Sequence, residues 1–138
     1  VIAGGEEGTV AIGLYLAEAG AWVLKLKDVE RARQAAPRTP EELVTTGVSV
    51  LQNLILEPHL GITPQVLAET DRVIYSIDEA QARSRVQAGE AGAAFILNPT
   101  FVGQVWRAAR RGVTMPQKST YFYPQLLTGL VFHSLDEE

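Results

Sequence analysis

Apolar and polar residues alternate in the first part of the chain. In residues 9–16 every second side chain is a bulky aliphatic one, and a similar alternation returns in residues 21–27. A period of two is typical of a strand that buries one face. The short segment between them ends in Gly20, which can adopt the positive φ of a tight turn. The pattern therefore predicts an antiparallel hairpin with one buried face.

The middle of the chain carries helix signals. Residues 28–38 are charged and rich in alanine, which indicates a short helix or a mobile linker that stops at Pro37. Next, Thr39 predicts a helix cap, Pro40 takes the first helical position and Glu42 completes a capping box. An apolar stripe with helical spacing comes after it and ends before Pro58; it consists of Val48, Leu51, Leu54 and Ile55.

The sequence of the second half of the chain predicts alternating strands and helices. Residues 72–76 form a short strand, and Asp78 caps a helix that Gly89 closes. Residues 93–97 are apolar and short enough for a buried strand. Asn98 or Thr100 then caps a helix that runs through Arg111, with Val102, Val105, Trp106 and Ala109 on one face. Residues 128–135 make a last strand.

These elements have the order β-β-α-β-α-β-α-β. A hairpin succeeded by strand–helix units indicates an α+β (α/β-like) fold, in which helices pack mainly on one face of a mixed sheet. The length fits a single domain over residues 1–138. The chain starts with Val1 and its only methionine is Met115. We therefore expect the C-terminal fragment of a longer protein.

Composition narrows the possible functions. The net charge of −4 argues against a nucleic-acid partner, because such proteins present a basic surface. Without cysteine there are no disulfides or thiolate sites, and with two histidines, His59 and His133, we expect no metal site. No apolar run approaches the roughly 18 residues of a membrane span, and no signal peptide opens the chain. We expect a cytoplasmic protein without a membrane partner; the composition identifies no cofactor.

The most distinctive chemistry lies in residues 115–130, a loop with one cation, an adjacent serine and threonine, and three consecutive aromatic residues. In it, Lys118, Ser119 and Thr120 resemble an anion cradle, since a lysine supplies charge and the hydroxyls supply donors. The glycine-rich part of a phosphate-binding P-loop is missing. The alternative is that Lys118 is solvated and the two hydroxyls cap turns.

Two further pairs are candidates for ligand binding. Tyr121 and Tyr123 share one face of an extended segment, where they would bind a planar ligand or a partner chain, or pack at a sheet edge with their hydroxyls on the backbone. Asn98 and Thr100 lie where a strand gives way to a helix, a place where ligands gather in α/β sheets. A plain helix cap also explains this second pair.

A catalytic centre is not evident. Glu57 and His59 place an acid and an imidazole at a helix end, which favourable interaction with the helix dipole explains as well as catalysis does. The chain shows no Ser-His-Asp set and no paired carboxylates at a useful spacing. Catalytic residues are therefore unknown, and we do not expect the fragment alone to be an enzyme.

Several of these segments together resemble a known family. They are Leu56-Glu57-Pro58, Gly89-Glu90-Ala91, Ala94-Phe95-Ile96-Leu97-Asn98-Pro99-Thr100 and Met115-Pro116-Gln117-Lys118-Ser119-Thr120-Tyr121-Phe122-Tyr123-Pro124. On these motifs the chain resembles the C-terminal half of the bacterial and archaeal domain-of-unknown-function family numbered 1015. The family usually has lysine where this chain has Gln125, a change that removes one positive charge from the loop.

The resemblance implies a missing N-terminal domain as a partner. Full-length members carry an Asp-Gly-His-His-Arg motif similar to those of nucleotide-using enzymes such as free-serine kinases, so the whole protein would be a nucleotide- or phosphate-dependent enzyme. This chain would then be an accessory domain that binds a small anionic ligand bearing phosphate or carboxylate. The alternative is a structural or interaction domain that seals a sheet edge or forms a domain or homo-oligomer interface.

Overall fold

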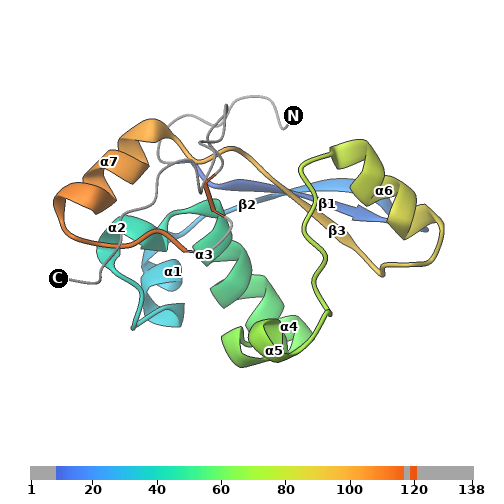
Figure 1. Ribbon diagram of the computed structural model, residues 1–138, viewed down its shortest axis with the longest axis horizontal. Helices are drawn as coiled ribbons and strands as arrows, with labels where there is room; N and C mark the ends of the chain where they lie inside the picture. The colour runs from blue at the N-terminus through green and yellow to red at the C-terminus, as the bar shows by residue number, and fades with distance from the viewer. Residues whose placement is uncertain (1–8, 117–118, 121–138) are drawn as a thin grey trace, which may run out of the picture.

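The computed structural model describes residues 9–116 and 119–120, and within them a three-stranded antiparallel sheet lies at the centre (Figure 1). The predicted hairpin is confirmed as β1 (Ala11–Leu16) and β2 (Gly20–Lys25). The predicted strand over residues 93–97 is confirmed as β3 (Ala94–Leu97), which pairs with the other side of β1 and gives the order β2-β1-β3. The α+β class is thus confirmed.

The expectation of a mixed sheet is wrong for the described residues, where both strand pairings are antiparallel. The strand predicted over residues 128–135 lies outside the described residues. The helical elements are, in chain order, α1 (Val29–Ala35), α2 (Glu41–Val44), α3 (Gly47–Leu51), the π-helical η1 (Gln52–Leu56), α4 (Glu57–Leu60), α5 (Pro64–Glu69), α6 (Glu79–Gln87) and α7 (Val102–Arg110). None of the described helices is long and apolar enough to cross a membrane.

Both faces of the central strand β1 are covered. Ile12 is 2% exposed and clusters with Val10 and Val50, on the side of α3 and η1. Tyr15 points to the opposite face, where it clusters with Val86 of α6 and Ala94 of β3. The prediction of one buried face is therefore wrong for β1, because α6 returns over the second face of the sheet (Figure 1).

The helix start predicted at Asp78 is confirmed, and Asp28, which was not predicted to be a cap, starts α1 in the same way. The Asp28 carboxylate accepts the amides of Glu30 and Arg31, and Asp78 does the same for Ala80 and Gln81. An aspartate that accepts two free amides at a helix start stabilises the first turn.

The capping box predicted at the start of α2 is wrong. The residue before the helix is Pro40, and no side chain caps it. Thr39 instead belongs to a turn, in which its N–H donates to the carbonyl of Ala36 at 3.0 Å. Glu42 does not complete a capping box, because its carboxylate lies 3.1 Å from the guanidinium of Arg111 beyond α7. A long-range ion pair has thus replaced the local cap.

The helix that should stop at Pro58 continues through it to Leu60. Proline lacks an N–H, and its ring clashes with the carbonyl four residues earlier in a regular α-helix. The chain widens to a π-turn just before it, where the N–H of Glu57 bonds the carbonyl of Gln52. This wider turn lets α3, η1 and α4 succeed one another without a loop, and Gly61 ends the run with a φ of 63°.

The strand predicted over residues 72–76 is absent. The segment connects α5 to α6 and belongs to no sheet. Its apolar side chains are largely in solvent, with Ile74 52%, Tyr75 63% and Ile77 90% exposed. Strand propensity requires a neighbouring strand to pair with and a surface to pack on, and this segment has neither among the described residues.

Candidate functional site

Four of the seven predicted ligand-binding residues can be placed. Lys118, Tyr121 and Tyr123 lie outside the described residues. Asn98 and Thr100 come directly after β3, and Ser119 and Thr120 come after α7. The two pairs belong to separate sequence motifs, so the site depends on whether the fold brings them together.

A hydrogen bond joins the two segments. The hydroxyl of Thr100 donates to the main-chain carbonyl of Ser119 at 2.6 Å, although 19 positions separate the two residues. The segment after α7 therefore returns to the point where β3 ends. We call this meeting point, formed by Asn98, Thr100, Ser119 and Thr120, the β3–α7 junction.

Ser119 is buried in the junction, and its polar groups bond to the chain itself. The residue is 8% exposed, and its hydroxyl donates to the carbonyl of Pro116 at 2.6 Å. Its own N–H reaches the same carbonyl at 3.3 Å. These two bonds close a turn of the kind that serine side chains commonly stabilise.

The start of α7 differs from its prediction. Neither Asn98 nor Thr100 caps the helix, because Phe101 is the residue before it and has no side chain that can accept an amide. Gln104 closes the turn from within, as its side-chain oxygen accepts the N–H of Phe101 at 3.2 Å. The prediction is wrong because Thr100 is committed to Ser119.

The packing face of α7 also differs from the prediction. The helical pattern predicts that Val102 and Trp106 face the core, yet they are 74% and 60% exposed. Ala108 is fully buried instead, and the helix rests on α2. The small alanine allows this close approach, and the ion pair between Arg111 and Glu42 holds the end of α7 against α2.

The hydrogen bonds limit what the junction can do chemically. A hydroxyl has one proton to donate. The protons of Thr100 and Ser119 both go to carbonyls of the chain, so an incoming anion would meet two acceptors there. The side chains of Asn98 and Thr120 are half-buried and form no hydrogen bond within the described part of the chain. Of the four side chains of the junction, these two remain able to donate a hydrogen bond to a ligand.

No group of three or more metal-binding side chains occurs among the described residues. Glu57 and His59 are both exposed on α4, and neither side chain is hydrogen-bonded within the described ranges. The pair thus lies on an open helix surface. Acid–base catalysis needs groups held within hydrogen-bond reach of a bound substrate, and nothing described here holds these two.

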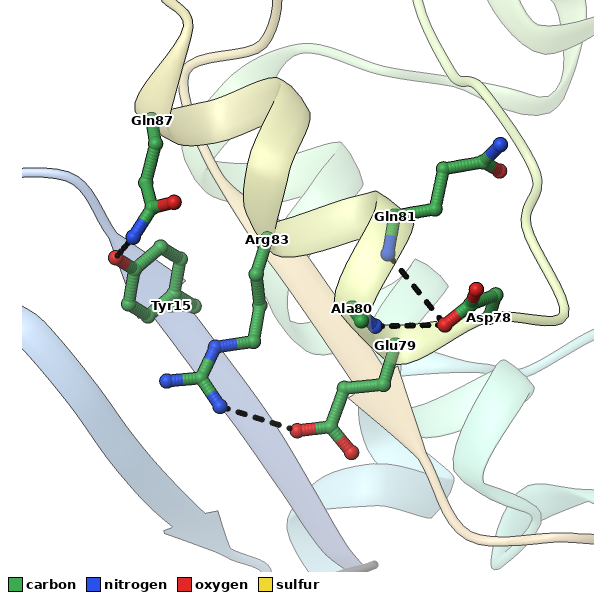
Figure 2. Close-up of polar contacts among 7 residues, drawn as sticks. All are labelled: Tyr15, Asp78, Glu79, Ala80, Gln81, Arg83 and Gln87. Atoms are coloured by element: carbon green, nitrogen blue, oxygen red, sulfur yellow. Dashed lines mark hydrogen bonds and ion pairs between the residues drawn. The ribbon is translucent and has the colours of Figure 1, made fainter.

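A polar cluster that the sequence did not predict joins α6 to the sheet (Figure 2). The amide of Gln87 donates to the Tyr15 hydroxyl at 3.0 Å, and the Arg83 guanidinium lies 4.8 Å from the centre of the Tyr15 ring. Arg83 also contacts the carboxylate of Glu79 at 3.4 Å. The three α6 residues are spaced by four, which places them on one helix face and was visible in the sequence. The sequence did not show that Tyr15 of β1 is their partner.

This cluster explains how α6 stays on its face of the sheet. Tyr15 is 8% exposed, and its ring packs with Val86 beneath the helix. Arg83 covers the ring from the solvent side, with its side chain 45% exposed. Because each polar group has a partner within the cluster, its geometry is that of a structural contact.

No family model, curated protein or solved structure matches the chain. The resemblance to family 1015 therefore stays a prediction from its motifs.

Proposed function

We propose that this chain is a structural and interaction domain, in which the segment after α7 seals the sheet at the end of β3. The hydrogen bond from Thr100 to the Ser119 carbonyl carries the proposal. It ties a distant segment to the sheet, and it uses the donor that a ligand site would need. Burial of Ser119 and its closed turn with Pro116 support the same role.

The experiment that tests this role compares the unfolding free energies of two threonine variants. Thr100→Val keeps the shape of the side chain but removes the donor to a partly buried carbonyl. An acceptor left without its partner costs about 1–3 kcal/mol, and we expect a loss in that range. Thr120→Val is the matched control, since its hydroxyl has no partner within the described residues.

A comparison of the two variants shows whether the Thr100 hydrogen bond stabilises the fold. We expect Thr120→Val to stay within about 0.5 kcal/mol of the parent chain, because it removes no hydrogen bond to a described residue. Equal stability of Thr100→Val and the parent would show that the junction does not hold the fold together. The proposal would then be abandoned.

A second candidate function is supported by the meeting of the two motifs. An accessory site for a phosphate or carboxylate would use the Asn98 amide and the Thr120 hydroxyl, which lie next to the Thr100–Ser119 bond in the sequence. Thr100 and Ser119 would shape this site without donating to the ligand. An N-terminal domain of the kind that the family resemblance implies would supply the reactive groups.

Titration of inorganic phosphate and of ATP tests the second candidate. Binding that Asn98→Ala and Thr120→Val both weaken, while Thr45→Val leaves it intact, would favour the ligand site. Thr45 is a suitable control because it is a half-buried threonine at the end of α2. Identical binding by all the variants would remove Asn98 and Thr120 from consideration.

A further inference from the structure

Helix α6 packs on β1 and β3 and lies apart from the other described helices (Figure 1). Of its nine residues only Val86 is buried, and five are exposed. Val86 packs with Tyr15, and the two polar contacts of the helix with the sheet, from Gln87 and Arg83, are made to the same tyrosine (Figure 2). The position of α6 on the sheet therefore depends largely on one side chain of β1.

The opposite face of the sheet carries much more apolar packing. There Ile12, Val10 and Val50 are buried together, and seven partly buried hydrophobic side chains pack against them. Under α6 three buried residues are joined by two partly buried alanines. Burial of apolar surface is the dominant favourable term in folding. Separation of α6 from the sheet should therefore cost less free energy than separation of α3 and η1 from the other face.

The segment before α6 does not tie the helix to the sheet. It comprises residues 70–78, of which eight are exposed. Within the described part of the chain, its hydrogen bonds go to α5, to α6 or to the segment itself. Nine extended residues span up to about 30 Å, so this segment can follow a large displacement of the helix.

The link from α6 to β3 also permits movement. Gly89 ends the helix with a φ of 76°, and Gly92 follows just before β3. A Cβ on Gly92 would meet no atom within 4 Å, so the main chain there lies in open space. Glycine can change its φ and ψ at little cost, and a few loop residues of this kind are sufficient for a hinge.

We propose that α6 is a flap, which opens from the sheet while the rest of the fold stays intact. Opening exposes Val86 and the Tyr15 face of β1 and β3, and it breaks the bond from Gln87 to the Tyr15 hydroxyl. The cluster around Ile12 meanwhile keeps the hairpin and α3 together. The β3–α7 junction contains no residue of α6 or its links, so the proposal is independent of the role of that junction.

Labelling of buried thiols tests the flap, because the chain contains no cysteine. Val86→Cys places a thiol under α6, where the valine is 2% exposed. Val50→Cys is the matched control, a helical valine that is 5% exposed in the cluster around Ile12. Each thiol reacts only after an opening that exposes it. We expect Val86→Cys to be labelled at least about ten-fold faster under native conditions, because only the control requires the larger core to open.

The urea dependence of labelling distinguishes the two kinds of opening. An opening that exposes little surface responds weakly to urea, whereas unfolding of the whole chain responds strongly. We expect labelling of Val86→Cys to change little at low urea and labelling of Val50→Cys to accelerate steeply. Equal rates with equal urea dependence would show that α6 separates only when the whole chain unfolds, and this result would overturn the proposal.

A substitution on the far face of the sheet provides an independent check. Val10→Ala removes packing from the cluster around Ile12 and leaves the contacts of α6 in place. Combined with each thiol variant, it should accelerate the labelling of Val50→Cys and leave that of Val86→Cys unchanged. Equal acceleration of both would show that the two thiols are exposed by the same global event, against the proposal.

Hydrogen exchange of the parent chain tests the flap without any substitution. A nine-residue helix is marginal in water, so the amides of α6 should exchange once the helix has left the sheet. We expect them to exchange well before the amides that pair β1 with β2. Exchange of both groups at the same rate would overturn the proposal.

Discussion

The two outer strands of the described sheet, β2 and β3, are both mostly apolar but differ in how exposed they are. Ala94 of β3 is buried and its other residues are half-buried, whereas four of the six residues of β2 are exposed. β3 packs on both faces: Ala94 lies under α6, and Leu97 packs with the cluster around Ile12. The backbone of α3 also comes close, since a Cβ on Gly47 would lie 3.5 Å from the Leu97 side chain.

The difference shows that the elements returning over a strand decide how exposed it is, since β3 is covered by α6, which precedes it in the chain, and by the cluster around Ile12. After β3 the chain turns into α7 and is tied back by the Thr100–Ser119 bond. After β2 it leaves into α1, and Leu26 is the last residue that bonds β1. We therefore expect substitutions near the covered strand β3 and on the open strand β2 to have different effects on stability.

The largest effect is expected at the strand between the two edges. Ile12→Ala removes a side chain that is 2% exposed at the centre of β1, and we expect a loss of about 2–5 kcal/mol in unfolding free energy. Val23→Ala on the open edge should cost far less, because that side chain is mostly in water already. Urea unfolding of both variants measures the contrast, and equal losses would contradict the description of β2 as open.

A smaller effect is expected where α6 closes the face over β1 and β3. Tyr15→Phe removes the hydroxyl that accepts from Gln87 and keeps the ring in place. A hydrogen bond of this kind contributes about 0.5–1.5 kcal/mol, and we expect a loss in that range. Gln87→Met should lose a similar amount, and the double variant should lose little more than either alone, because the two residues share one bond. Additive losses would show that they act separately.

Removal of the guanidinium over the Tyr15 ring should have a still smaller effect. Arg83→Met keeps the aliphatic cover of the ring but loses the cation above it. At an exposed site such a contact contributes about 0.5–1 kcal/mol, so we expect a thermal shift of a few degrees at most. Arg83→Lys retains the charge and should recover part of the loss. A loss as large as that of Ile12→Ala would place Arg83 in the core instead.

The smallest effect is expected at the ion pair between α1 and α2, away from both edges. Arg33 and Glu41 approach to 2.8 Å, but their side chains are 49% and 71% exposed. Exposed pairs contribute about 0–1 kcal/mol and are screened by salt. Arg33→Met should therefore change stability least at high salt, and a large salt-independent loss would contradict the assignment of this pair to the surface.

Local signals in the sequence predicted the parts of the fold that depend on neighbours in the chain. Alternation and Gly20 predicted the hairpin, and Asp78 predicted the start of α6, because each needs only adjacent residues. The segment over residues 72–76 had the residues of a strand, but its pairing depends on a neighbour that no local signal specifies. For the same reason, the sequence did not predict that α6 packs over Tyr15.

The candidate site shows this limit most clearly. Thr39 and Thr100 both looked like helix caps, yet Thr39 joined a turn and Thr100 bonded Ser119 across 19 positions. Glu42 likewise pairs with a residue that is distant in the sequence, Arg111. The motifs around Asn98 and Ser119 were recognised separately, but the sequence could not show that they meet. Side chains with several possible partners can be assigned only when the fold has brought those partners together.

Our main proposal is that the β3–α7 junction holds the fold together, and the competing proposal is an anion site at Asn98 and Thr120. Thermal unfolding in phosphate and in chloride at matched ionic strength tests the two directly, with the parent chain, Thr100→Val and Thr120→Val compared. We predict that Thr100→Val lowers the melting temperature equally in both salts, and that phosphate raises the melting temperature of all three chains by the same amount, as its general effect on folded proteins requires. An additional stabilisation of the parent by phosphate that Thr120→Val abolishes would contradict the main proposal.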